Sequence, residues 1–335
     1  MIYRKIDVVR NPFKITELPP MALFCKYWFD NLPRRKIIGK ISRACFINLF
    51  RLGVNSYGKF IFNGTQTVQF NARNTQFSSI YLEQFKDSYE SEIGVLLDLL
   101  VPYNGVFYDV GSNFGYFSLY VASKSGFKGQ IYSFEPHPHS YLDLLSMIEQ
   151  TSLKEIVTPN CIGAHLNNET VYIKPSSARS GNFSIVDKSD SEKDAFQVEL
   201  RRLDDLNFSQ PDLIKIDVEG NEEKVLRGCD QIIAKSTPHI IFESSLCYER
   251  PQQTIGPFDV LGEKGYIFFY VGWFKNFENV KRGIILNVDS IDTKDKKMIA
   301  LSLLNPEQRF LFSERLNILA IHKTKYDKFR NLFEG

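Results

Sequence analysis

Two segments of this sequence combine residue types and spacings that can do chemistry. In the first, GVFYDVGSNFGYFSL, Asp109 lies near the end of an apolar run, and Gly111 and Gly115 follow it. Glycines let a backbone turn tightly and approach a ligand, and a helix that begins after such a turn presents N–H groups to the ligand. The turn of residues 109–115 is therefore a candidate site for a flat or anionic cofactor group.

The glycine spacing at this turn separates two classes of cofactor. It is D-x-G-x-x-x-G, without the third glycine that a dinucleotide-binding turn needs. S-adenosylmethionine (SAM) has no phosphate, and an aspartate such as Asp109 attracts its ammonium group. The turn therefore favours SAM, with a nicotinamide-dependent oxidoreductase on the same architecture as the alternative.

A single acid, Glu135, ends the next apolar run, twenty residues after Gly115. A carboxylate at the tip of the second strand is placed to accept hydrogen bonds from both ribose hydroxyls of an adenosyl group. The alternative is a solvent-facing turn before Pro136. Together with the glycine turn, Glu135 favours an adenosyl cofactor.

The second segment is PDLIKIDVEGNEEKVLRG, residues 211–228, in which an apolar strand ends in a group of carboxylates. Ligands bind outside the carboxyl ends of strands in open α/β sheets, so Asp217 and Glu219 are candidates for proton abstraction or metal ligation. Glu222 and Glu223 have another explanation, because acids in the first turn of a helix stabilise its dipole.

The elements that must position these residues alternate between apolar strands and amphipathic helices. Strands are expected at residues 106–110, 130–134, 156–162, 213–217, 239–243, 266–271 and 316–321. Helices are expected at residues 89–102, from about 116, at 141–150, and between the strands at 213–217 and 239–243. This alternation indicates a doubly wound, mostly parallel α/β sheet with right-handed crossovers.

The chain length suits one catalytic domain with an extension, because 335 residues can bury a full core. The segment before the catalytic domain has turn signals between short apolar runs, which indicates antiparallel strands. We expect an N-terminal helical extension at 1–58, a lead-in β segment at 59–88, and a catalytic domain at 89–335 that carries an insertion near 171–206 and an insert near 272–315, helix-prone around 292–305.

Charge and cysteine content exclude several classes of partner. The 41 basic and 39 acidic residues give a formal net charge of +2, which creates no field that would hold nucleic acid. The five cysteines form no C-x-x-C pair, so neither zinc nor a redox dithiol is indicated. Neither a signal-peptide pattern nor an apolar stretch of about 18 residues is present. We therefore expect a cytoplasmic protein that acts on a small-molecule or glycan acceptor.

Residues 21–54 mix large apolar side chains with basic ones. This composition suits peripheral contact with the anionic inner face of a membrane. It also suits amphipathic helices that pack on the catalytic domain or on a second copy of the chain. Both explanations stay open.

Taken together, the motifs resemble those of the FkbM family of methyltransferases. The matching pieces are YESE at 89–92, FYDVGSNFGYFSL at 107–119, FEP at 134–136, RLDDL at 202–206, DLIKIDVEGNEEKVLRG at 212–228, IIFESS at 240–245 and EKGY at 263–266. The resemblance covers roughly residues 60–270. It implies a Rossmann-like class I methyltransferase fold, with a seven-stranded sheet in the order 3-2-1-4-5-7-6 and SAM as the cofactor.

The resemblance also implies roles for individual residues. By motif position, the glycine turn takes the methionine side of SAM and Glu135 takes the ribose. The full cofactor-binding set that we expect is Asp109, Gly111, Ser112, Asn113, Gly115, Glu135, Pro136, Asn160 and Asp217.

Methyl transfer to a hydroxyl of a sugar, a glycan or a secondary metabolite is the reaction that the resemblance implies. Displacement at a sulfonium needs alignment and a base for the acceptor proton, and we expect Asp217 or Glu219, with Glu243 beside them, to supply it. A divalent cation on Asp217 and Glu243 is a second option. His137 and His139 are further candidate bases. A non-catalytic SAM-binding assembly module is the alternative, and the sequence does not identify the acceptor.

Overall fold

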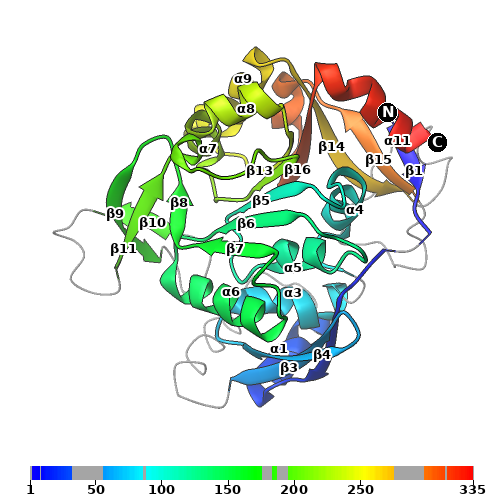
Figure 1. The fold of residues 1–335 in the computed structure, drawn as a ribbon, viewed down its shortest axis with the longest axis vertical. Coiled ribbons are helices and arrows are strands. Elements are labelled where there is room, and N and C mark those ends of the chain that lie inside the picture. The colour runs from blue at the N-terminus through cyan, green and yellow to red at the C-terminus, as the bar shows by residue number, and fades with distance from the viewer. Residues whose placement is uncertain are drawn as a thin grey trace.

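The computed structural model describes residues 2–7, 9–31, 56–85, 88–175, 183–186, 195–274, 298–313 and 315–334. A nine-stranded sheet forms the centre, helices cover both of its faces, and two smaller sheets lie beside it (Figure 1). None of the helices in these ranges is long and apolar enough to cross a membrane.

The central sheet contains the predicted parallel core. Its order is β1-β15-β14-β16-β13-β12-β5-β6-β7; the strands from β13 to β7 are parallel, and β16 is antiparallel to both neighbours. Numbered along the chain, the seven strands from β7 to β14 have the order 3-2-1-4-5-7-6, which confirms the predicted fold class. The bounds are β1 Ile2–Lys5, β5 Val106–Val110, β6 Gln130–Phe134, β7 Val157–Asn160, β12 Leu213–Ile216, β13 His239–Ser244, β14 Tyr266–Phe274, β15 Met298–Leu303 and β16 Leu316–His322.

The two additional strands, β15 and β1, correct two predictions. Residues 298–303 form a strand inside the segment expected to be helical, because Ile299 and Leu301 bury their side chains while the backbone pairs with β14. The N-terminal extension, expected to be helical, supplies β1 and also β2 (Phe13–Glu17) before the helix α1 (Pro20–Asn31). Residues 32–55 lie outside the described residues, so membrane or homo-oligomer contact through residues 21–54 stays a prediction.

Helices pack on both faces of the central sheet, as a doubly wound fold requires (Figure 1). Two separate apolar cores lie on these faces, one beneath α4, α5 and α6 and one beneath α7, α8 and α9. The bounds of the helices are α3 Ser78–Tyr81, α4 Ser91–Leu100, α5 Tyr116–Ala122, α6 Pro138–Gln150, α7 Glu222–Gly228, α8 Asp230–Ser236, α9 Pro251–Glu263 and α11 Tyr326–Glu334. Short 3-10 turns are η1 Thr75–Phe77, η2 Glu83–Phe85, η4 Leu203–Asp205, η7 Pro306–Leu311 and η8 Lys323–Lys325.

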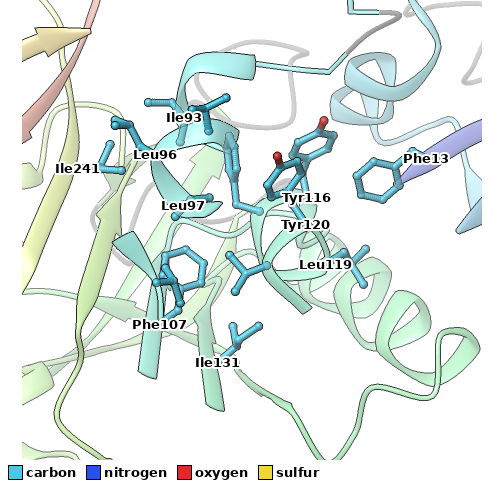
Figure 2. Packing of buried hydrophobic residues seen from close by; sticks show 14 of the residues in the cluster. Phe13, Ile93, Leu96, Leu97, Phe107, Tyr116, Leu119, Tyr120, Ile131 and Ile241 are labelled. Carbon is cyan, nitrogen blue, oxygen red and sulfur yellow. The ribbon is translucent and has the colours of Figure 1, made fainter. Parts of the chain in front are cut away.

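The first core anchors α4 and α5 on β5 and β6. Figure 2 shows Leu96 and Leu97 of α4 above Phe107 of β5, with Leu119 of α5 to the right and Ile131 of β6 at the bottom of the view. All five side chains are at most 1% exposed. Each such burial contributes roughly 1.5–3 kcal/mol, so α4 and α5 are firmly anchored above the strands whose ends carry the polar residues.

Two smaller sheets flank the central one. The sheet β10-β9-β11-β8 contains the insertion expected near 171–206, and the predicted strand at 156–162 is interrupted at Cys161, so that its end joins this second sheet as β8. The sheet β2-β3-β4 contains the lead-in strands. Their bounds are β3 Tyr57–Phe62, β4 Gln66–Asn71, β8 Ile162–Ala164, β9 Glu169–Pro175, β10 Phe183–Val186 and β11 Phe196–Arg201.

Candidate active site

A cavity of about 270 Å³ opens at the carboxyl ends of β5, β6, β12 and β13. Its wall combines the glycine turn after β5, the ends of the neighbouring strands, and side chains from β8, β9 and β11. Several predicted site residues line it: Gly111, Ser112, Asn113, Glu135, Pro136, Asp217, Glu219 and Glu243.

The glycine turn has the backbone geometry that its sequence predicts. Gly111 has φ +80°, and a Cβ on it would lie 1.9 Å from the carbonyl oxygen of Asp217. Gly115 has φ +89°, and a Cβ there would lie 2.5 Å from Leu144 Cδ1. Side chains at either position would be strained and would clash, so Gly111 lets the turn approach the end of β12 and Gly115 lets it approach α6.

The turn's N–H groups are occupied within the chain, contrary to the expectation that they would be free for a ligand. Gly111 and Ser112 donate to the carbonyl oxygen of Phe134, and Gly115 donates to that of Ser112. The N–H of Asn113 donates to Glu135 at 2.9 Å. The side chains of the turn are therefore its remaining hydrogen-bonding groups for a cofactor.

Asp109 lies behind the cavity wall, which changes its expected role. Its side chain is 1% exposed, and Oδ2 accepts from both the N–H (3.0 Å) and the hydroxyl (2.6 Å) of Ser118. Burial raises the pKa of Asp109 above its ordinary value. Its contacts fix the first turn of α5 on β5, so it positions the glycine turn and is not among the residues that line the cavity.

Glu135 lies in the cavity wall, and each of its two carboxylate oxygens accepts one backbone hydrogen bond. Oε2 accepts from the Asn113 N–H and Oε1 from the His137 N–H, each at 2.9 Å. Burial raises the pKa of Glu135 to about 7. A carboxylate oxygen accepts more than one hydrogen bond, so both oxygens retain capacity for a pair of hydroxyls.

Charged residues alternate in sign at the ends of β12 and β13. Lys215, 3% exposed, donates from Nζ to Asp217 Oδ2 at 3.2 Å. Arg315 spans two acids, with 3.2 Å from Nη1 to Glu243 Oε1 and 3.4 Å from Nη2 to Glu219 Oε2. Burial alone lowers the pKa of Lys215, but the charges of Asp217 and other nearby acids raise it above its ordinary value, so the ammonium stays protonated.

The family of this domain follows from comparison with known proteins. Residues 109–268 match the family model of the methyltransferase FkbM domain. These residues form an FkbM-family methyltransferase domain. Membership implies SAM as the cosubstrate. The match starts at Asp109 and ends within β14, so it includes the glycine turn, Glu135 and the acidic strand ends.

Several solved structures are distantly similar to parts of this chain. An FkbM methyltransferase from Methylobacillus flagellatus is 15% identical, with a TM-score of 0.37, covering 60% of this chain and 44% of that one. A SAM-dependent O-methyltransferase from Thermotoga maritima is 13% identical, with a TM-score of 0.36, and the match covers 69% of this chain and 63% of that one. A precorrin-6y C5,15-methyltransferase from Geobacter metallireducens is 14% identical, with a TM-score of 0.37, covering 70% and 88%. No curated protein gave a match. The match to the Methylobacillus flagellatus methyltransferase spans less than half of that protein's length.

The cavity of the FkbM domain suits SAM chemically. Ser112 Oγ and His165 Nε2 are buried at its wall and have no hydrogen-bond partner among the described residues. The apolar side chains of Ile173 in β9 and of Val198 and Leu200 in β11 form another part of the wall. Unpaired buried polar atoms are costly unless a ligand or water satisfies them, and an apolar wall accepts a flat base.

A divalent metal does not suit the predicted pair Asp217 and Glu243. Each carboxylate already has a cationic partner, Lys215 for one and Arg315 for the other. Within the described ranges, histidines, cysteines and acids form no group of three or more that could hold a metal ion. The fixed cations supply the positive charge that a dication would otherwise bring.

Three other predicted candidates lie away from the cavity wall. Asn160 donates to the carbonyls of Ser133 and Thr158, at 3.2 and 3.0 Å, so its side chain supports the strand ends. His137 caps α6, and burial lowers its pKa to about 4. His139 packs edge-on against Phe196 with its ring centroid 5.3 Å away. Neither histidine is among the lining residues.

Sequence reasoning missed residues that the fold adds to the site. Tyr89 lines the cavity from the segment before α4, and Glu90 beside it has φ +39°. Burial raises the pKa of Glu90 to about 8, although the charge of Lys215 opposes this shift. Lys215 left a readable signal, since a lysine inside a buried apolar strand needs a charged partner. Arg315 left none, because it comes from beyond the matched segment.

Proposed function

We propose that the protein transfers the methyl group of SAM to a hydroxyl of an uncharged, polyhydroxylated acceptor of the sugar or glycan class. The observation that carries this proposal is the row of alternating charges at the ends of β12 and β13, beside the cavity that suits SAM. Three parts of the proposal rest on this row of charges: the uncharged acceptor, the transfer to an oxygen atom, and the modification of a sugar or glycan.

The charge balance of the row favours a neutral acceptor. The cations of Lys215 and Arg315 pair with the three acids Asp217, Glu219 and Glu243, so every charge in the row has a partner and one formal negative charge is left over. A strongly anionic or cationic acceptor would have to break these pairs. Hydroxyl groups both donate and accept hydrogen bonds, so they can add to charged donors and acceptors without displacing them.

SAM supplies, when bound, an electrophilic methyl group on its sulfonium. The residues of this chain then have two tasks: to align the acceptor hydroxyl and to take its proton. Asp217 is the base that we favour, because it lines the cavity and Lys215 engages only its Oδ2. Glu243 is the second carboxylate within the row, and burial raises its pKa, with the charge of Asp217 adding to the shift.

The proposal is tested by incubating the full chain with SAM and a panel of neutral sugars, uronic acids and amino sugars. Formation of S-adenosylhomocysteine and a mass gain of one methyl group are measured for each. We expect turnover with neutral sugars, at least tenfold above the charged ones. Turnover only with charged acceptors would reject the acceptor class, and absence of transfer to any hydroxyl would favour a non-catalytic SAM-binding module.

The variant Asp217→Asn tests whether Asp217 acts as the base or contributes to SAM binding. It should lower kcat by roughly 100-fold or more, the usual size of general-base catalysis, and leave the SAM dissociation constant within about twofold. Asp259→Asn on the exposed side of α9 is the matched control and should change neither quantity. Full activity in the Asp217 variant would remove it from the mechanism.

A further inference from the structure

A turn that precedes the matched domain is built onto the glycine turn. Asn74 donates from Nδ2 to Asn113 Oδ1 at 2.9 Å and to Asp143 Oδ2 at 3.0 Å. Three residues later, Phe77 stacks on Phe114 with ring centroids 4.1 Å apart. Residues 74–79 are therefore held against the cofactor turn by a polar clamp and by an aromatic stack, although they lie outside residues 109–268.

This packing brings Ser79, which lies outside the matched domain, to the wall of the cavity. Ser79 and Ser112 both line the cavity, and they are 5% and 6% exposed. Neither Oγ has a hydrogen-bond partner among the described residues. Ser79 and Ser112 thus line one cavity, and each has a buried hydroxyl without a partner among the described residues, which indicates a ligand group that hydrogen-bonds to both.

The rest of the cavity narrows down which part of SAM this group is. The carboxylate of Glu135 is suited to the ribose hydroxyls, and the apolar side chains of Ile173, Val198 and Leu200 are suited to the base. The groups of SAM that remain are the α-carboxylate and α-ammonium of its amino-acid end. Because the turn's N–H groups at residues 111–115 are already bonded, side chains must supply the donors to that carboxylate, and the unpartnered hydroxyls of Ser79 and Ser112 are available for it.

We propose that Ser79, together with Ser112, binds the α-carboxylate of the methyl donor, so that the lead-in segment completes the cofactor site. The inference rests on the proposed use of SAM. It makes Ser79 a binding residue contributed from outside the family-matched domain, and it makes Asn74 and Phe77 positioning residues for it. The segment of residues 74–79, which contains η1 and the start of α3, is then part of the cofactor-binding unit.

The test compares two ligands that differ in the amino-acid end. S-adenosylhomocysteine carries it, whereas 5′-methylthioadenosine has the same base, ribose and thioether sulfur without it. In titration calorimetry of the full chain, Ser79→Ala should weaken S-adenosylhomocysteine binding about tenfold or more, the usual loss for a hydrogen bond to a charged group. Binding of 5′-methylthioadenosine should change less than about twofold, because its contacts do not include Ser79.

Ser78→Ala is the matched control, since Ser78 is the adjacent serine and does not line the cavity. It should leave both dissociation constants unchanged. An unaltered S-adenosylhomocysteine affinity in Ser79→Ala, or equal weakening of both ligands, would overturn the inference while leaving the proposed function intact. If the wild-type chain bound neither ligand, the proposed function itself would fail, and the inference with it.

Discussion

Replacing Lys215 by methionine tests the electrostatic construction of the site. The lysine is 3% exposed and its Nζ lies 3.2 Å from Asp217 Oδ2. The substitution keeps an apolar side chain of similar length but leaves the Asp217 carboxylate without this cationic partner. Breaking a fully buried ion pair from one side costs about 3–5 kcal/mol. The Asp217 side chain is 28% exposed, so water compensates part of the loss, and we expect a destabilisation of about 2–3 kcal/mol.

The assay is urea unfolding followed by circular dichroism. With an m-value of about 3 kcal/mol/M, the Lys215→Met variant should unfold at a urea concentration lower by roughly 1 M. The double variant Lys215→Met/Asp217→Asn should recover at least half of the loss, because the stranded charge is gone. Lys154→Met breaks the exposed Lys154–Glu149 pair and should cost no more than about 0.5 kcal/mol.

Two results would refute this reasoning. One is a cost for Lys215→Met no larger than that for Lys154→Met, which would mean that the buried ammonium compensates no charge. The other is a double variant less stable than the single one, which would mean that the carboxylate is stabilised by contacts other than Lys215.

Gly111→Ala should lower the melting temperature by several degrees and weaken SAM binding, because the new Cβ would lie 1.9 Å from the Asp217 carbonyl and φ +80° costs a further 1–2 kcal/mol or so; an unchanged melting curve would contradict the close approach of the turn to the end of β12. Burial raises the folded-state pKa of Glu135 to about 7, above about 4.3 in the unfolded chain, so its contribution to stability is full below about pH 4.3 and falls as the pH rises to about 7. Glu135→Gln should therefore flatten the fall in stability between about pH 4.3 and 7 by an amount on the order of 3 kcal/mol, and an identical pH profile would show that the group is not buried as described. Arg315→Gln should raise the KM for the acceptor by up to about tenfold without changing the SAM dissociation constant, since the exposed arginine orders two acceptor-side acids; a change confined to SAM affinity would move Arg315 to the cofactor.

The local elements of the fold could be predicted because their sequence patterns are self-contained. The runs at 106–110 and 130–134 became β5 and β6 with the predicted bounds, since continuous apolar residues are typical of strands buried on both faces. Gly111 and Gly115 likewise occupy positive-φ positions that few other residues tolerate.

The remaining features depend on contacts between distant residues. Residues 298–303 form a strand because their backbone pairs with the open edge of β14. The charged residues around them in the sequence favour a helix, so the sequence alone predicts the wrong element. Asp109 was assigned to the cofactor from its place at the strand end, yet the hydroxyl of Ser118, nine residues later, turns the side chain into the protein. Arg315 meets Glu219 and Glu243 only because β16 inserts beside β13.

Titration calorimetry of the 335-residue chain with SAM tests whether the cavity holds the methyl donor. We expect saturable binding of one SAM per chain, in the cavity that Glu135 lines, with no binding of NAD under the same conditions. Binding of NAD without binding of SAM would contradict this expectation.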